Sequence, residues 1–204
     1  MSPTRIHLAS KSPRRHALLR QLGVEFDVLL LRAAPGRTPD VVEEARDGEP
    51  ARHYVERIAR TKAAVGWDRV IRRGLAPNPV LGADTEVVVD DSVLGKPGDA
   101  AHAVDMLSRL AGRTHEVLTG VAVRHDDDVA FALSVTRVKF APLSRSAIER
   151  YVQTGEPLDK AGAYAIQGHA AAFVERIEGS YSGVVGLPLF ETASLLARAG
   201  YAVP

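Results

Sequence analysis

The amino-acid sequence predicts an α/β fold in which helices flank a mixed β-sheet. Three observations support this prediction: apolar residues alternate in several short segments, other segments carry apolar residues at helical spacing, and the two kinds of segment interleave irregularly. Expected hairpins in the middle of the chain argue against a purely parallel sheet. No stretch has the composition of a linker, so we expect one domain over residues 1–204.

Capping residues and apolar patterns delimit the expected elements. Ser12 as N-cap, Pro13 in the first turn and Gly23 after the last turn enclose the first helix, and Asp99 and Ser144 begin two later helices. Strands are expected at residues 6–10, 24–30, 80–83 with an extended continuation over 86–89, 93–94, 117–123 and 131–135. Further helices are expected at residues 51–66 and 188–199, a loop at 32–50, and a glycine-rich mixture of short strands and loop at 159–186.

Composition and charge exclude several classes of protein. The chain contains no cysteine, which excludes disulfides and thiolate chemistry. A net charge of +1 and a pI near 8.1 provide no global attraction to nucleic acid or membranes, and 5% aromatic residues without a basic stripe disfavour nucleic-acid binding. No apolar run reaches the length of a membrane span, so we expect a soluble cytoplasmic protein with no membrane partner.

The segment from Ser10 to Arg15 is the first candidate for chemistry. A strand that leads into a helix N-terminus presents free N–H groups and the positive end of the helix dipole, which attract anions. Arg14 and Arg15 lie in the first turn, where the dipole disfavours cations, and a bound phosphate chain would explain them. The alternative is a pair of solvated arginines, and the motif alone favours neither interpretation.

Lys62 and Asp84 are the next candidates. Lys62 follows Ile58 by four residues and therefore shares its apolar stripe. Such a lysine usually extends along the surface to solvent, and the functional alternative is a phosphate contact. Asp84 follows an apolar strand, where it could bind a metal or accept a proton from water, or simply form a local turn.

Two weaker motifs complete the set. Lys96 stands between Gly95 and Pro97 in an expected tight turn, which would aim its charge, although many such lysines are only solvated. Gln167 lies in the run from Asp159 to Gly168, where glycines allow a ligand to approach the backbone and the amide could pair with a nucleobase. The competing interpretation of that run is a bulged strand.

Together these motifs resemble the Maf family of nucleotide pyrophosphatases. The matching stretches occur in family order and cover nearly the whole chain. They are LASKSPRRHALLRQLGVEF, GADTEVVVDDSVLGKPGDA, LSRLAGRTHEVLTGVAV, YVQTGEPLDKAGAYAIQG and FVERIEGSYSGVVGLPLFET.

The resemblance implies a fold, an activity and partners. It implies an α/β unit with two lobes around a cleft, similar to the inosine triphosphatases, and a homodimer. It also implies hydrolysis of a nucleoside triphosphate between the α- and β-phosphates with Mg²⁺ or Mn²⁺. Asp84 matches the family's proton acceptor, and the triphosphate-binding positions match Ser10, Ser12, Arg15, Lys62 and Lys96.

The resemblance also indicates a subfamily. Arg14, Thr85 and Gln167 match the type that cleaves dTTP and UTP, whereas the type associated with 7-methyl-GTP carries Trp after Ser-Pro and Ser-Glu-Gly in place of Ile-Gln-Gly. An amide at Gln167 can both donate to and accept from a pyrimidine, while a carboxylate suits a donor-rich guanine edge. The chemistry therefore agrees with the match.

The chain departs from the family pattern at one place. Many relatives carry Asp-x-Asp-Glu in the loop after the second strand, and that Glu helps to hold the metal. Here the stretch runs from Asp40 to Glu44, with Val42 at the position of the second acid. We align the metal ligand with Glu43, alongside Asp84, and a slip of one residue would assign it to Glu44.

The family resemblance also implies an alternative function, a nucleotide-binding regulator of septum formation or cell division without essential catalysis. Both functions need a triphosphate pocket, but only an enzyme needs Asp84 and a metal ligand. Both carboxylates are present, which favours catalysis.

Overall fold

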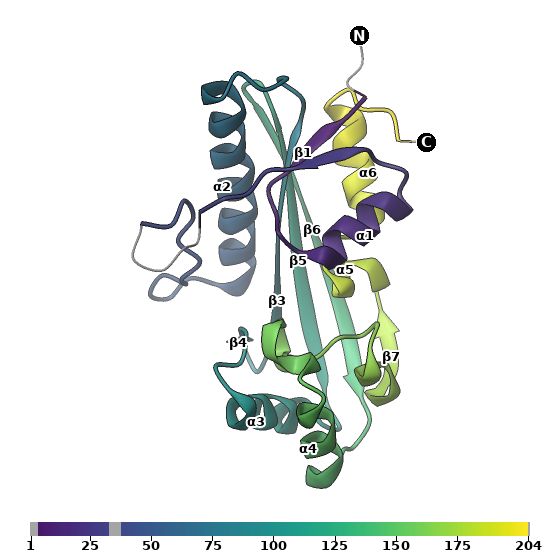
Figure 1. Cartoon of the computed structure of the whole chain (residues 1–204). Helices are drawn as coiled ribbons and strands as arrows, with labels where there is room; N and C mark the ends of the chain where they lie inside the picture. The colour runs from purple at the N-terminus through teal and green to yellow at the C-terminus, as the bar shows by residue number, and fades with distance from the viewer. Residues whose placement is uncertain (1–3, 33–37, 204) are drawn as a thin grey trace. The chain divides into compact units, whose positions relative to one another are not determined.

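The computed structural model describes residues 4–32 and 38–203 (Figure 1). In that part of the chain, one seven-stranded sheet has the order β2-β1-β3-β5-β6-β7, with β4 paired to β3. β1 is parallel to β2 and β3, whereas β4 is antiparallel to β3 and β7 is antiparallel to β6. The predicted mixed sheet is confirmed. The strands are β1 (Ile6–Leu8), β2 (Phe26–Val28), β3 (Val80–Val89), β4 (Ser92–Leu94), β5 (Thr114–His125), β6 (Asp128–Phe140) and β7 (Val174–Glu178).

Helices of two kinds accompany the sheet. The α-helices are α1 (Pro13–Gln21), α2 (Ala51–Arg72), α3 (Ala100–Leu110), α4 (Arg145–Gln153), α5 (Tyr181–Val185) and α6 (Leu189–Arg198). The 3-10 helices are η1 (Glu156–Asp159), η2 (Ala161–Ala163) and η3 (His169–Phe173). No helix in residues 4–32 and 38–203 combines the length and apolar character needed to cross a bilayer.

The chain divides into two compact units. The first comprises Met1–Asp84, Thr119–Ser134 and Gly186–Pro204, and the second comprises Thr85–Leu118 and Val135–Val185. The boundaries fall inside β3, β5 and β6, so each of these strands contributes residues to both units.

The predicted caps are confirmed where local chemistry determines them. Ser12 accepts a hydrogen bond from the Arg15 N–H at the start of α1. Asp99 and Ser144 cap α3 and α4 in the same way, through backbone N–H groups three residues further on. Each cap pairs one of the N–H groups that a helix leaves open in its first turn.

α2 is longer than predicted. Gly66 is not its end: the helix continues to Arg72, and Trp67 and Val70 are buried on the same core. A Cβ at Gly66 would lie 2.7 Å from Val80 Cγ1 and 3.3 Å from Ala9 Cβ, so this glycine serves close packing against the sheet. In the first unit α2 lies on one side of the sheet, and α1 and α6 lie on the other (Figure 1).

Gly82 brings β3 against α2. A Cβ there would lie 2.6 Å from both the Ala59 O and the Ala63 N, and 2.9 Å from Lys62 Cβ. The absent side chain therefore lets the strand touch the helix backbone. Side chains two residues apart on a strand share a face, so Asp84 faces the same helix.

β2 is shorter than predicted, and its alternation does not mark a buried face. Val28 and Leu30 are 42% and 55% exposed, whereas Leu29 is 3% exposed. The strand ends at Val28, and the Leu29 N–H donates to the Leu8 O. Because β2 is an edge strand, only one of its sides is fixed by pairing.

The second unit differs from prediction in its glycine-rich part. The three 3-10 helices lie within residues 156–173 with no strand among them, so the bulged-strand interpretation of the run to Gly168 is wrong; β7 is the strand that follows. Gly162 adopts φ +69°, and a Cβ on it would lie 2.7 Å from Val87 Cγ2. The rings of His115, Phe140 and Tyr164 pack edge to face in the core of this unit.

Candidate functional site

Two acids and a lysine form the centre of the candidate site in the first unit. Lys62 Nζ lies 2.8 Å from Asp84 Oδ1 and 2.9 Å from Glu43 Oε1. Lys62 and Asp84 are only 8% and 7% exposed. The interpretation of Lys62 as a lysine that extends to solvent is therefore wrong, because its ammonium group on α2 bridges one carboxylate from the preceding loop and one from β3.

Asp84 keeps one oxygen open. Its Oδ2 is buried and has no hydrogen-bond partner among the residues that the structure describes. Asp84 also lies within β3 rather than at its end, so the predictions of a strand end and of a local turn are both wrong. A buried, unpaired carboxylate oxygen costs roughly 1–3 kcal/mol or more, which marks this atom as a candidate for binding or proton transfer.

The loop that carries Glu43 is attached to α2 at its far side by Glu49. Arg57 donates from Nε and Nη2 to the two Glu49 oxygens at 2.6 Å each, and these hydrogen bonds lower the pKa of Glu49 to about 2. The same Arg57 Nη2 donates to the Glu44 O at 3.0 Å. Glu44 thus contacts α2 through its carbonyl, while the carboxylate that meets Lys62 belongs to Glu43.

Asp40 attaches the near side of the same loop. Its carboxylate pairs with Arg32 at 2.9 Å and with Arg69 of α2. Burial alone would raise the pKa of Asp40, but hydrogen bonds from Arg32 and the charge of Arg69 lower it overall. Glu43 is therefore held between two ion-paired anchors on α2.

The start of α1 supplies the site's arginine. Arg15 donates from Nε to the Gly186 O at 2.8 Å and from Nη1 to Ser10 Oγ at 3.3 Å. Ser10 Oγ also accepts from the Ser12 N–H at 3.2 Å. Arg15 is thus fixed by hydrogen bonds, and the alternative of a solvated surface arginine is wrong for this residue.

The charges of the acids reach Arg15. Burial lowers the pKa of Arg15. The negative charges of Asp84 and Glu43 act to raise that pKa, and the positive charge of the neighbouring Arg14 lowers it. An arginine remains protonated under these influences. The first unit therefore places Arg15, in the first turn of α1, in the electrostatic neighbourhood of Asp84.

Three predicted residues lie in the second unit. Thr85 follows Asp84 directly and is half-buried, whereas Lys96 and Gln167 are exposed. The turn of Lys96 is attached to the glycine-rich run, since the Gly162 N–H donates to the Gly95 O at 3.1 Å. The structure thus groups Ser10, Ser12, Arg14, Arg15, Glu43, Lys62 and Asp84 in one unit and Thr85, Lys96 and Gln167 in the other.

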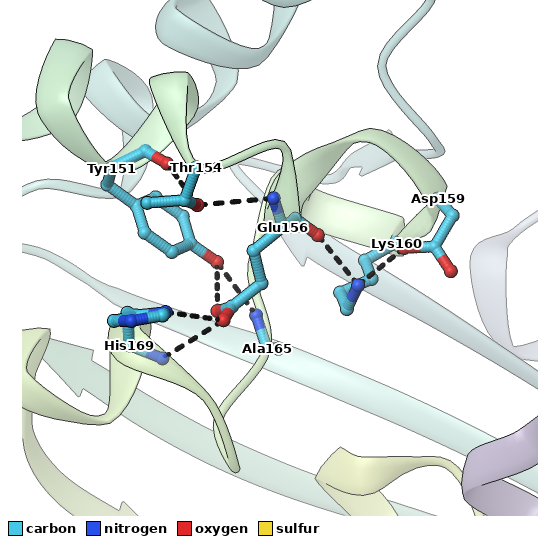
Figure 2. A network of polar contacts seen from close by, with 7 residues as sticks. All are labelled: Tyr151, Thr154, Glu156, Asp159, Lys160, Ala165 and His169. Atoms are coloured by element: carbon cyan, nitrogen blue, oxygen red, sulfur yellow. Dashed lines mark hydrogen bonds and ion pairs between the residues drawn. The ribbon is translucent and has the colours of Figure 1, made fainter.

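Sequence reasoning missed the polar contacts that hold the Gln167 loop. Glu156 accepts hydrogen bonds from Tyr151 and His169 on either side of that loop (Figure 2). The segment Gly-Glu-Pro-Leu-Asp was part of a matching stretch, but no local pattern marked its Glu as a hydrogen-bond centre.

The acids suit a hard divalent cation as a partial ligand set. The described residues contain no cluster of three or more His, Cys, Asp or Glu that could hold a metal ion. Glu43 and the open Oδ2 of Asp84 provide a pair of carboxylates, and Mg²⁺ is commonly bound by one or two carboxylates with water and substrate phosphate completing its shell. The donor chemistry therefore fits such an ion.

Comparison with known proteins identifies the family. The family model described as Maf-like protein matches residues 5–199. The chain belongs to the Maf family. The match includes every predicted site residue of this Maf protein, from Ser10 to Gln167.

Curated relatives are similar to this Maf protein over almost their full length. A dTTP/UTP pyrophosphatase of Aromatoleum aromaticum is 52% identical over 198 residues, which cover 97% of this chain and 96% of the relative. A dTTP/UTP pyrophosphatase of Burkholderia pseudomallei is 55% identical, covering 95% and 93%. A dTTP/UTP pyrophosphatase of Nitrosomonas europaea is 50% identical, covering 97% and 96%.

Proposed function

We propose that this Maf protein hydrolyses dTTP and UTP to the nucleoside monophosphate and pyrophosphate. The three relatives described above, which carry this activity in their names, align over at least 95% of the chain. The observation that carries the proposal is the buried pair of Lys62 and Asp84, which leaves one aspartate oxygen without a hydrogen-bond partner among the described residues.

Asp84 is the proposed proton acceptor. Its Oδ1 is engaged by Lys62, which compensates the charge of the buried carboxylate, while Oδ2 remains available to a water molecule. The water oxygen bonds to the α-phosphorus, its proton passes to Asp84, and the bond from the α-phosphorus to the bridging oxygen breaks. Pyrophosphate leaves with the electron pair of that bond.

Cations from several segments are proposed to hold the triphosphate. Phosphoryl transfer depends mainly on positioning and on compensating charge spread over the phosphate oxygens. Arg15 is fixed by Ser10 at the N-terminus of α1, a place that favours anions. Ser12, Lys62 and Lys96 complete the proposed set of phosphate contacts.

Glu43 and Asp84 are the proposed ligands of Mg²⁺ or Mn²⁺. When bound, the divalent ion would supply positive charge against the phosphate oxygens. The ion-paired anchors at Asp40 and Glu49 support Glu43 as the ligand, because they hold its loop on α2. Glu44 uses its carbonyl in that anchoring.

Base selection is assigned to Arg14, Thr85 and Gln167. Gln167 is exposed, so its amide is accessible to a base, and an amide can pair with the carbonyl and N–H groups of a pyrimidine. In accordance with the family resemblance, we further propose that residues 1–204 act as one catalytic domain and that the active form is a cytoplasmic homodimer.

The direct experiment incubates the purified protein with UTP, dTTP, GTP and ATP in the presence of Mg²⁺ or Mn²⁺. Pyrophosphate and orthophosphate are measured separately, because they report cleavage at different phosphoanhydride bonds. We expect pyrophosphate from UTP and dTTP in preference to the purine nucleotides. Nucleotide binding without pyrophosphate release would contradict the proposal and favour a binding regulator.

A further inference from the structure

Gln167 lies in a short loop of the second unit, residues 166–168. The residues on both sides of this loop are held in place. Gln167 is exposed, whereas Ile166 before it and Ala170 after it are buried. We propose that Glu156 is a positioning residue that fixes this loop, so that the Gln167 amide meets the pyrimidine base in one orientation. The proposal rests on the role in base selection proposed above for Gln167.

Glu156 connects both sides of the loop through hydrogen bonds (Figure 2). Tyr151 donates from its hydroxyl to Glu156 Oε1 at 2.8 Å and accepts from the Ala165 N–H at 3.2 Å. Glu156 Oε2 accepts from the His169 N–H at 3.1 Å and is 2.9 Å from His169 Nδ1. Residues 166–168 are thus held at both ends by one carboxylate and one phenol.

The backbone of Glu156 is itself held by hydrogen bonds. The Glu156 N–H donates to Thr154 Oγ1 at 3.2 Å, and that hydroxyl donates to the Tyr151 O at 2.6 Å. Lys160 Nζ donates to the Glu156 O at 2.6 Å and pairs with Asp159 (Figure 2). The anchor is therefore rigid on the side away from the loop, which is what a positioning role requires.

Gly168 shows how closely the loop approaches this anchor. A Cβ on Gly168 would lie 2.3 Å from Glu156 Oε2 and 2.5 Å from the other two carboxylate atoms. Its backbone φ of −107° is open to any residue, so the constraint at this glycine is the contact with Glu156: a side chain here would have to displace the carboxylate. The contact with Glu156 thus explains the glycine of Ile-Gln-Gly without reference to any ligand.

The charges at the anchor agree with the hydrogen bonds. Burial would raise the pKa of Glu156, but hydrogen bonds from His169 and Tyr151 lower it overall, so the carboxylate is ionised and can only accept. Burial and the contact with Glu156 raise the pKa of Tyr151, which keeps its hydroxyl protonated as a donor. Every donor around Glu156 therefore has an acceptor.

The test replaces Glu156 by Gln, which keeps size but puts an N–H₂ group against one of these donors. We expect kcat/KM for UTP to fall by roughly 10- to 100-fold, and the ratio of UTP to GTP to fall about tenfold, mainly through KM. The matched control is Glu149→Gln on α4, a half-exposed carboxylate that pairs with Arg145 one turn earlier, and it should leave both quantities unchanged. An effect equal for UTP and GTP, or none, would overturn the proposal.

A double-mutant cycle separates positioning from general structural damage. In a Gln167→Ala background the loop has no amide to orient, so Glu156→Gln should cause no further loss of base selectivity. Gly168→Ala should act as Glu156→Gln does, whereas Gly98→Ala should not, since a Cβ at Gly98 has only one contact, at 4.0 Å. Additive losses of selectivity in the cycle would contradict the proposal.

Amide hydrogen exchange gives a readout that needs no activity. In the full-length chain without nucleotide, Glu156→Gln should accelerate exchange in a peptide spanning residues 165–169 by at least about tenfold, with little change in β3. Unchanged exchange would overturn the anchoring itself. If the wild-type protein released no pyrophosphate from pyrimidine nucleotides, the proposed function would fail, and the exchange result would still decide whether Glu156 holds the loop.

Discussion

The two carboxylate clusters of this Maf protein differ in how completely their oxygens are bonded. In the second unit, both oxygens of Glu156 accept hydrogen bonds, from Tyr151 and from His169. In the first unit, Asp84 is more deeply buried, and its Oδ2 has no hydrogen-bond partner among the described residues. In the Glu156 cluster both carboxylate oxygens accept hydrogen bonds, whereas in the Asp84 cluster one carboxylate oxygen has no hydrogen-bond partner among the described residues.

This difference separates a supporting role from a chemical one. A carboxylate whose acceptors are all used stabilises a local conformation and has little capacity to accept a proton. A buried carboxylate with one open oxygen beside a lysine retains that capacity, and its cost to stability must be compensated elsewhere in the fold. The comparison predicts that changes at the two kinds of site will have different signatures.

Removal of the lysine should break the first cluster most severely. Lys62→Met leaves the buried Asp84 without its cation, and such an unpaired buried charge costs about 3–5 kcal/mol. Urea unfolding in the presence of EDTA measures this loss. Lys11→Met, at an exposed lysine, should stay within about 0.5 kcal/mol of wild type.

Mg²⁺ sharpens the same prediction. Added Mg²⁺ should recover part of the stability of Lys62→Met, because a bound cation replaces the lost charge between Glu43 and Asp84. Equal stability of Lys62→Met and wild type in EDTA would show that the lysine is not the charge partner of Asp84.

His115 offers a neutral counterpart to Asp84 in the second unit. Its Nδ1 is also buried and unpaired within the described part of the chain, while Nε2 is 2.9 Å from the Tyr164 hydroxyl. Burial lowers the pKa of His115 from its usual 6.5 to about 4. Between these two pH values the unfolded chain binds the additional proton, so stability must fall as the pH is lowered.

The expected loss from His115 is up to about 3 kcal/mol between pH 6.5 and pH 4. His115→Phe keeps an aromatic ring against Phe140 and Tyr164 but has no proton to bind. Denaturant unfolding at a series of pH values should therefore show a steeper decline for wild type than for His115→Phe. Parallel profiles would mean that His115 titrates normally in the folded protein.

Gly82 determines how close α2 and β3 come in the first cluster. Gly82→Ala would force a methyl group to within 2.6 Å of helix backbone atoms, and such overpacking typically costs about 1–3 kcal/mol. The displaced helix should also lower the pyrophosphatase rate, since Lys62 is carried by that helix. Gly98→Ala provides the control, and equal stability of the two variants would refute this account of the contact.

Local chemistry explains which features were predictable from the sequence. The caps at Ser12, Asp99 and Ser144 depend on residues a few positions away, and all three were predicted. The end of α2 was not predicted correctly. Glycine commonly marks the end of a helix, but Gly66 instead allows a close contact with Val80, which is distant in the chain.

The residues of the candidate site likewise differ in whether the sequence alone could predict their roles. The motifs and the family resemblance assigned Lys62 and Asp84 to one site, but the residues alone left a solvated lysine as the commoner outcome. The close approach at Gly82 decides between them, and it is a tertiary contact. Glu156 was missed because its donors, Tyr151 and His169, lie on both sides of it in the sequence without a recognisable pattern.

The most direct test of the central claim is the pyrophosphatase rate of Asp84→Asn at saturating UTP and Mg²⁺. An amide keeps the size of the side chain but cannot serve as the proton acceptor, so kcat should fall by roughly 10²- to 10⁴-fold. Asp91→Asn, at an exposed turn, is the control and should retain the wild-type rate. Near-wild-type turnover by a folded Asp84→Asn protein would contradict the assignment of Asp84 as the base.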